Sequence, residues 1–139
     1  GKKAIFIDPF YNYTAAHMAD KWIASRPGTD AALAQAIAYV WLEQETYDKK
    51  FIEGRTLGFD QFKKYILGRE DGVKKTPRWA EKITGVKAAI IEALAKEWAS
   101  KRTMLGCGSR GGFGGACREA YGHEWARLMV YLQAMQGLG

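Results

Sequence analysis

Short apolar runs and stretches of helical periodicity alternate along the chain. Residues 4–7 form an uncharged apolar run, which predicts a strand buried on both faces, as in parallel sheets. The run ends at Asp8 and Pro9, because proline has no amide hydrogen to donate and disfavours the helical conformation for the residue before it. Residues 21–24 and 103–105 are further strand candidates. The pattern therefore predicts an α/β fold with a short parallel sheet.

The strongest helical signal begins at Asp30. Apolar residues at helical spacing predict a helix from there to about Glu45, and Thr29 or Asp30 is its predicted cap, at the end where the helix dipole favours negative charge. Weaker signals predict a helical turn at 49–53, helices at 59–67, 78–83 and 89–101, and a last helix that begins at 116–118.

Individual residues predict two further helix starts and one surface loop. Thr14 is the predicted cap of a short helix before the second strand. Thr76 followed by Pro77 predicts a helix start, because the first helical position does not need an amide hydrogen. Residues 69–75 are polar and are predicted to form a surface loop.

The composition is that of one ordinary globular domain. The chain has 139 residues, of which 47% are hydrophobic and 26% charged. No apolar run approaches the roughly 18 residues that a membrane span needs, so we expect no direct membrane insertion. The chain begins at Gly1 and ends at Gly139 without an initiator methionine, and we interpret it as a piece of a longer protein. The compartment stays open, cytoplasmic or periplasmic in a prokaryote.

The formal charge of +6 favours an anionic partner. The lysines and arginines are scattered, so no nucleic-acid surface is predicted, whereas a phosphate-bearing cofactor needs only a few of them. An ordinary solvated surface explains the charge equally well. Cys107 and Cys117 are ten residues apart, which matches neither a zinc nor an iron–sulfur motif.

Two acidic residues stand at the two strand-to-helix junctions, which suggests a nucleotide lying across the sheet edge. Asp8 ends a strand, where an acid commonly accepts from a ribose hydroxyl; the alternative is a turn-forming Asp-Pro pair. Asp30 is positioned to cap a helix, and its carboxylate can also accept from the N1–H and N2–H groups of guanine.

A glycine-rich stretch at 106–115 lets backbone amides approach an anion or a flat ring, although a flexible surface loop is the alternative. It is neither a dinucleotide fingerprint nor a P-loop. The five tryptophans are interpreted as core, and His17 and His123 as surface or boundary residues. No catalytic triad or carboxylate pair is evident, so any chemistry would belong to a cofactor.

Taken together, these features resemble the large molybdopterin oxidoreductases of the dimethyl sulfoxide reductase family. The resemblance covers essentially the whole chain. The segments that carry it are Ile7-Asp8-Pro9, Arg26-Pro27-Gly28-Thr29-Asp30, Thr76-Pro77-x-Trp79-Ala80, Ile83-Thr84-Gly85-Val86 and the stretch 103–115.

The resemblance implies a Rossmann-like three-layer sandwich with a short parallel sheet and several helices. Residues 1–139 would form a single domain, part of the domain that binds a molybdopterin guanine dinucleotide in a larger enzyme. The cofactor-binding residues that it implies are Asp8, Pro9, Phe10 and Tyr11 along the ribose and phosphate, Gly28, Thr29 and Asp30 around the guanine, and Gly108, Ser109, Cys117 and Arg118 toward the pterin. The family often has glutamine before arginine where this chain has Cys117 before Arg118.

The implied parent enzyme transfers an oxygen atom or hydroxyl, with electron transfer, at molybdenum or tungsten. The resemblance implies no catalytic or metal-ligating residue within this chain, so the isolated fragment is expected to be inactive. Its implied partners are the remainder of the catalytic subunit and an iron–sulfur electron-transfer subunit. The alternatives are a stand-alone α/β nucleotide-binding or protein-interaction module, and an NAD-type dehydrogenase domain, which the missing glycine triplet disfavours.

Overall fold

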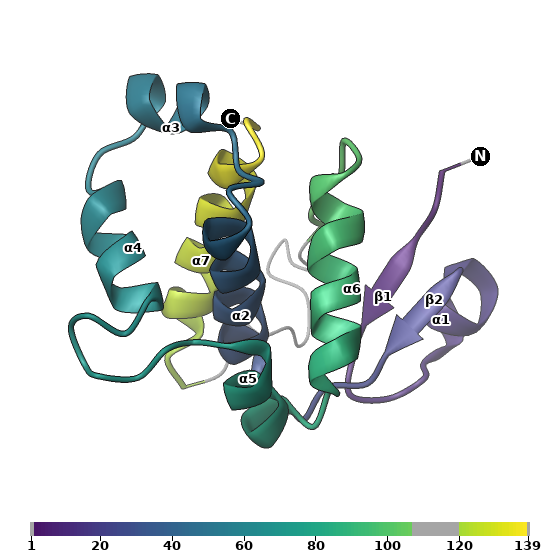
Figure 1. The fold of residues 1–139 in the computed structure, drawn as a ribbon. Helices are drawn as coiled ribbons and strands as arrows, with labels where there is room; N and C mark the ends of the chain where they lie inside the picture. The colour runs from purple at the N-terminus through teal and green to yellow at the C-terminus, as the bar shows by residue number, and fades with distance from the viewer. Residues whose placement is uncertain (1, 107–119, 139) are drawn as a thin grey trace.

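The computed structural model describes residues 2–106 and 120–138, which form a helix-rich fold with a two-stranded parallel sheet (Figure 1). Figure 1 shows the sheet to one side of the helices. The elements are β1 (Ile5–Ile7), α1 (Tyr13–Met18), β2 (Lys21–Ile23), α2 (Asp30–Glu43), α3 (Lys49–Arg55), α4 (Phe59–Ile66), α5 (Pro77–Thr84), α6 (Ala88–Ala99) and α7 (Gly122–Met135).

The strands β1 and β2 run parallel, as predicted, and α1 connects them. Ile5 pairs with Lys21, and Ile7 pairs with Ile23. The predicted cap of α1 is wrong: the side chain of Asn12 accepts from the amide of Ala15 at 2.8 Å, which places Thr14 inside the helix. Asparagine is an equally good cap, so composition alone does not choose between the two residues.

Two expectations about the sheet are wrong. Residues 103–105 form no strand, and Met104 is 87% exposed. An apolar run becomes a strand only where a neighbouring strand is there to pair with it. The residues of β1 are half-buried rather than buried on both faces. Only Ile23 of the sheet belongs to the fully buried core, while Ile5 and Ile7 pack against that core from one side.

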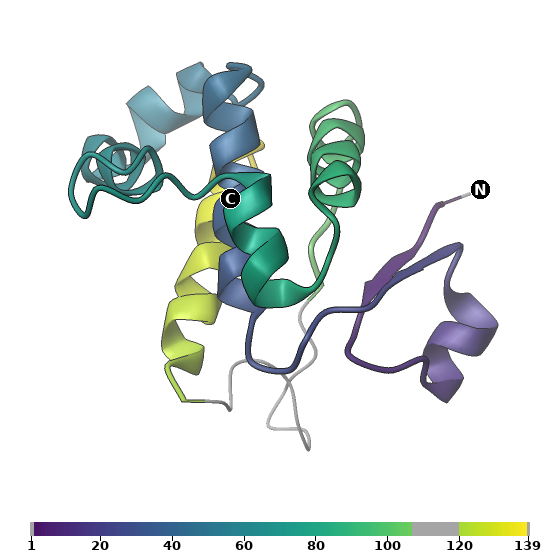
Figure 2. The same cartoon turned by 60° about the horizontal axis from the view of Figure 1, so that its bottom comes forward.

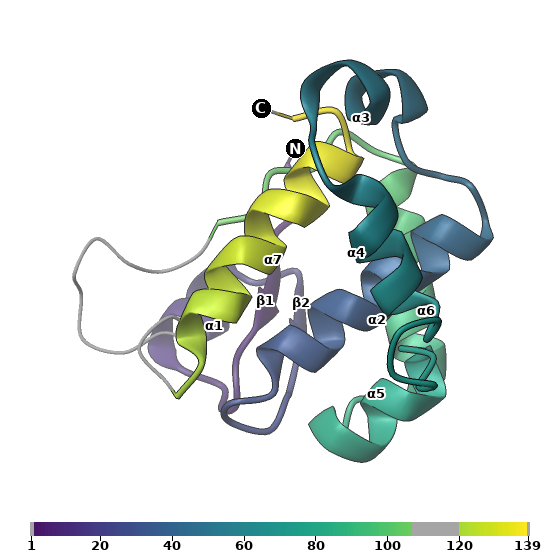
Figure 3. The same ribbon diagram turned by 90° about the vertical axis from the view of Figure 1, so that its left-hand side faces the viewer.

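The helix α2 is the centre of the fold, with α4, α5, α6 and α7 packed around it (Figure 3). Nine of its residues are buried, and four of these are alanines at alternate positions, which let the neighbouring helices approach closely. The predicted helix is confirmed, although it ends at Glu43 rather than Glu45. The helices predicted at 59–67, 78–83 and 89–101 are confirmed within two residues, and the turn at 49–53 extends to Arg55. The predicted start of the last helix at 116–118 lies outside the described residues.

Trp41 joins α2 to α6. Its side chain is fully buried, and its indole N–H donates to the carbonyl of Ala95 at 2.8 Å. The ring meets Trp98 edge to face, with ring centres 5.1 Å apart and an interplanar angle of 88°. The indole nitrogen of Trp98 is buried and has no hydrogen-bond partner within residues 2–106 and 120–138. This pair therefore combines apolar burial with one directional contact between the two helices.

The stretch predicted as a polar surface loop hides a buried lysine. Lys75 is only 2% exposed; its ammonium donates to the carboxylate of Asp71 and, at 2.9 Å, to the carbonyl of Val73. The same ammonium lies 4.5 Å from the ring centre of Tyr65. Charge pairing and the aromatic face offset the desolvation of the lysine, and the loop folds back onto α4.

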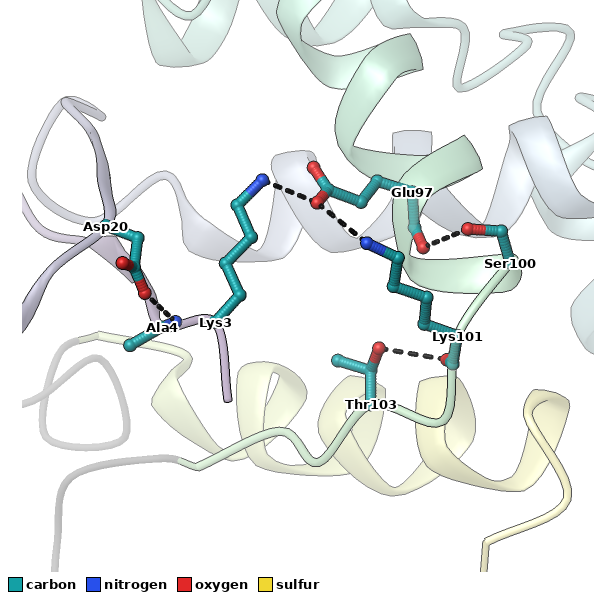
Figure 4. A network of polar contacts seen from close by, with 7 residues as sticks. All are labelled: Lys3, Ala4, Asp20, Glu97, Ser100, Lys101 and Thr103. Atoms are coloured by element: carbon teal, nitrogen blue, oxygen red, sulfur yellow. Dashed lines mark hydrogen bonds and ion pairs between the residues drawn. The ribbon is translucent and has the colours of Figure 1, made fainter. Parts of the chain in front are cut away.

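A polar network attaches the amino end of β1 to α6 (Figure 4). The ammonium of Lys3 lies 2.6 Å from the carboxylate of Glu97, and that of Lys101 lies 3.8 Å from the same oxygen. The Lys3 hydrogen bond, together with the two lysine charges, holds the pKa of the Glu97 carboxyl below its ordinary value. Beside this network, the amide of Ala4 donates to Asp20 at 2.7 Å.

The hydrogen bond of Trp41 predicts that substitutions of the two packed tryptophans differ in their effect on stability. Trp41→Phe should lower the free energy of unfolding by about 2–4 kcal/mol, because it leaves a cavity and removes the donor to Ala95. Trp98→Phe is the matched control, since it removes an N–H that has no partner in the described part of the chain, and the loss of unfolding free energy should be smaller by about 1 kcal/mol. Equal losses in urea denaturation would contradict the proposed importance of the hydrogen bond.

The lowered pKa of Glu97 predicts a pH dependence. Its contribution to stability is present above the unfolded-state pKa of about 4.3 and is lost as the pH falls through the lower folded-state pKa. Glu97→Gln should therefore reduce the loss of stability on acidification below about pH 5. Glu92→Gln, on the same helix and without an ion pair among the described residues, should leave that acid-side slope unchanged. Identical slopes for wild type and Glu97→Gln would contradict the assignment.

Candidate functional site

The carboxyl ends of β1 and β2 bring two loops to one edge of the sheet. Because the strands are parallel neighbours, the chain leaves both of them on the same side, toward α1 and toward α2 (Figure 2). The first loop begins at Asp8, and the second runs through Gly28 to Asp30. Asp8 follows the first strand directly, whereas Asp30 is the first residue of α2, seven residues after the end of β2.

Every polar group of Asp8 is held in place. Its amide donates to the carbonyl of Ile23 at 3.2 Å, and its own carbonyl accepts from the indole N–H of Trp22 at 3.1 Å. Its two carboxylate oxygens accept from the amide of Phe10 at 3.2 Å and from the side chain of Asn12 at 3.1 Å. Asp8 therefore does form a turn, and each carboxylate oxygen retains a lone pair for a further donor.

The residues after Asp8 are open to solvent. Pro9 is exposed, as are Phe10 at 66% and Tyr11 at 57%. The Tyr11 ring lies 5.4 Å from that of Trp22, at an interplanar angle of 62°. The interpretation of all five tryptophans as core is wrong for Trp22, which is 37% exposed, because its place on a sheet beside the helices leaves one side uncovered. It is correct for Trp41 and Trp98.

The second loop prepares the amino end of α2. Gly28 has a φ of 73°, the left-handed conformation that glycine adopts without strain. Thr29 occupies the cap position, but its hydroxyl donates to the carbonyl of Arg26 at 2.6 Å and makes no capping bond to the helix. The predicted cap is thus correct in position and wrong in bonding. Asp30 is the first residue of α2 and is half-buried.

Arg26 anchors this loop to the end of α5, a role that sequence reasoning missed. Its guanidinium donates to the carbonyls of Lys82 at 2.9 Å and Ile83 at 3.2 Å, and its amide donates to the carbonyl of Thr84 at 2.9 Å. A positive charge at the carboxyl end of a helix is favoured by the helix dipole. No local pattern could reveal this contact, since the partners are more than 50 residues away in sequence.

The structure does not describe the remaining predicted site residues. Gly108, Ser109, Cys117 and Arg118, predicted at the pterin end, are outside the described residues. Across 2–106 and 120–138, no three His, Cys, Asp or Glu side chains gather into a possible metal site. No helix in these ranges is long and apolar enough to cross a membrane.

A large hollow lies away from the sheet edge. It is a groove of about 800 Å³ between α3, α4 and α7, with Leu57 and Val130 exposed at its margin. The hydrogen-bond donors and acceptors of the two loops at the sheet edge suit a polar ligand better than the lining of the groove does.

The anchoring contact predicts how the second loop depends on α5. Arg26→Gln should lower the free energy of unfolding by about 1–2 kcal/mol and speed amide exchange at Gly28 and Thr29, because the charged donor to α5 is lost. Arg78→Gln makes the same change of charge on α5 at an exposed residue, and exchange in this loop should stay at the wild-type rate. Equal exchange in both variants would contradict the anchor.

Comparison with known proteins gives long matches to redox enzymes. The chain is 50% identical over its whole length to the pyrogallol hydroxytransferase large subunit of Pelobacter acidigallici. It is 40% identical over 99% of its length to trimethylamine-N-oxide reductase of Haemophilus influenzae, and 37% identical over 97% to trimethylamine-N-oxide reductase 1 of Escherichia coli. The chain spans 16% of the length of each of these relatives. No family model matches it.

The fold is also found in a solved structure. Acetylene hydratase from Pelobacter acetylenicus superposes with a TM-score of 0.71 over 97% of this chain and 17% of that chain, at 23% identity. The helix-rich arrangement with its parallel strand pair is therefore a fold that a larger enzyme contains. From the relatives and this fold together, we conclude that the chain belongs to the dimethyl sulfoxide reductase family of molybdopterin enzymes and corresponds to part of the large subunit.

Proposed function

We propose that this chain binds the guanine end of a molybdopterin guanine dinucleotide within a larger catalytic subunit. The observation that carries the proposal is the sheet edge, where parallel strands bring the Asp8 loop and the loop from Gly28 to Asp30 to the same side. Ligands of open α/β sheets bind at this edge. Both loops are accessible, and Asp8 retains acceptor positions that its own turn does not use.

Each loop has its own part in the proposed binding. Asp8 accepts from a ribose hydroxyl, and Pro9, Phe10 and Tyr11 lie along the ribose and phosphate. Gly28 and Thr29 approach the guanine through their backbone, and Asp30 accepts from its N1–H and N2–H groups. The side chains of Pro9, Phe10 and Tyr11 are exposed, so a ligand can reach this loop from solvent.

The rest of the proposal extends beyond the described residues. Gly108, Ser109, Cys117 and Arg118 are the proposed contacts at the pterin end. Residues 1–139 are proposed as part of a Rossmann-like three-layer domain to which the remainder of the subunit adds further elements. The half-buried parallel pair supports this, because parallel sheets are normally covered on both faces and rarely consist of two strands alone.

The proposed whole enzyme transfers an oxygen atom or hydroxyl, with electron transfer, at molybdenum or tungsten. The names of the relatives, a hydroxytransferase and N-oxide reductases, support this reaction class. When bound, the cofactor supplies the redox chemistry, and this chain supplies the binding and orientation of its nucleotide end. The isolated chain is therefore expected to be inactive. The proposed partners are the remainder of the catalytic subunit and an iron–sulfur electron-transfer subunit.

Protein interaction is a second candidate function, which the groove between α3, α4 and α7 favours. Leu57 at its margin is fully exposed, and Phe62 and Tyr131 line it. An exposed apolar groove of this kind commonly marks a protein contact. The two functions are compatible, because the groove and the sheet edge are built from different elements.

Nucleotide selectivity tests the proposed function. In calorimetric titrations the wild-type chain should bind GDP in preference to ADP, and Asp30→Ala should abolish that preference, because alanine offers no acceptor for the guanine edge. The substitution should cost no more than about 1 kcal/mol of stability, the contribution of one acid in the first turn of a helix.

Asp60→Ala is the matched control, since Asp60 is also an acid in the first turn of a helix, α4, away from the sheet edge. It should leave the preference for GDP intact. A preference that survives Asp30→Ala, or an Asp30→Ala chain that does not fold, would contradict the ligand role of Asp30. Selective binding of ADP by the wild-type chain would instead favour the dehydrogenase alternative.

A further inference from the structure

We propose that Trp22 is a positioning residue, which holds Asp8 in the orientation that meets the ribose and so sets how strongly the ribose hydroxyls contribute to nucleotide binding. The inference rests on the proposed function of this sheet edge and deepens it. Its starting point is the one tryptophan that the exposed fractions place outside the core, at 37%. A large aromatic side chain left at the surface beside a polar contact calls for an explanation.

Trp22 reaches across the sheet to the neighbouring strand end. It is the middle residue of β2, opposite Phe6 in the register, and its indole N–H donates to the carbonyl of Asp8 at 3.1 Å. Its ring also meets that of Tyr11, with ring centres 5.4 Å apart. The side chain of Trp22 thus contacts both Asp8, the first residue of the exposed loop, and Tyr11.

The contacts of Asp8 are of two kinds, those within its own loop and those to the sheet. The bonds to its carboxylate come from Phe10 and Asn12, which belong to the same loop and move with it. Only the backbone bond to Ile23 and the indole of Trp22 join Asp8 to β2. Without the indole, only the backbone bond to Ile23 joins Asp8 to β2, and we expect the direction of the carboxylate to be less firmly fixed.

A fixed acceptor binds more tightly than a mobile one, because the loop then need not be ordered when the ligand arrives. This advantage applies to the groups that Asp8 meets, which are the ribose hydroxyls. It does not apply to the guanine edge, which Asp30 reads from a different loop anchored by Arg26. Trp22 should therefore affect ribose recognition and leave base selectivity unchanged.

The test compares GDP with 2′,3′-dideoxy-GDP, and GDP with ADP, in calorimetric titrations of three chains. For the wild type we expect loss of the ribose hydroxyls to weaken binding by about tenfold, the effect of a hydrogen bond to a charged acceptor. In Trp22→Phe, which keeps a ring but removes the N–H, this ratio should fall toward one while the preference for GDP over ADP persists. Trp79→Phe, a half-buried tryptophan on α5, should leave both ratios at wild-type values.

A double substitution separates positioning from general loosening. Asp8→Ala, which leaves no side-chain acceptor, should by itself remove the ribose effect, and adding Trp22→Phe should then change the ribose ratio no further, because both residues act through the same contact. If Trp22→Phe leaves the ribose ratio unchanged, or weakens ribose and base selectivity together, the inference is wrong. A wild-type chain that prefers GDP over ADP without any ribose effect overturns the inference but not the guanine site. A wild-type chain that binds neither nucleotide overturns the proposed function and the inference with it.

Discussion

The burial of α2 is the constraint on which the rest of the structure depends. Helices surround it along most of its length, and side chains such as Ile37 and Trp41 are almost completely removed from solvent. Burying one such side chain contributes about 2–3 kcal/mol, whereas an exposed ion pair such as that of Lys3 with Glu97 contributes far less, because water screens it. Apolar packing therefore sets where α2 lies, and the surface charges only adjust how the sheet is attached to the helices.

The position of α2 determines the position of the candidate site. Because the helix body is fixed by its neighbours, its amino end with Thr29 and Asp30 is held in a fixed place after the loop that leaves β2. Arg26 reinforces this placement through the last turn of α5. A loop tied at both ends to a packed core can present its backbone and one carboxylate with little loss of conformational freedom on binding. The Asp8 loop lacks such a core beneath it and depends on contacts to β2.

The sequence predicts those features that depend on neighbouring residues. Periodicity identifies α2, proline after Thr76 identifies the start of α5, and the two acidic junctions at Asp8 and Asp30 are recognisable without a structure. The features that it misses depend on distant partners. The burial of Lys75 requires the rings of Tyr65 and Trp79, and the strand expected at 103–105 lacks a strand to pair with. Family resemblance gives the ligand class, but it does not reveal the contact between Trp22 and Asp8, which follows from the register of two strands.

The measurement that tests the central claim most directly is an NMR titration of the isotopically labelled chain with GDP, and with ADP for comparison. The account predicts selective shifts with GDP in the amide signals of Asp8, Thr29 and Asp30, at the edge where both strands end. Shifts confined to the groove between α3, α4 and α7, or equal shifts with both nucleotides, would contradict a guanine site at the sheet edge.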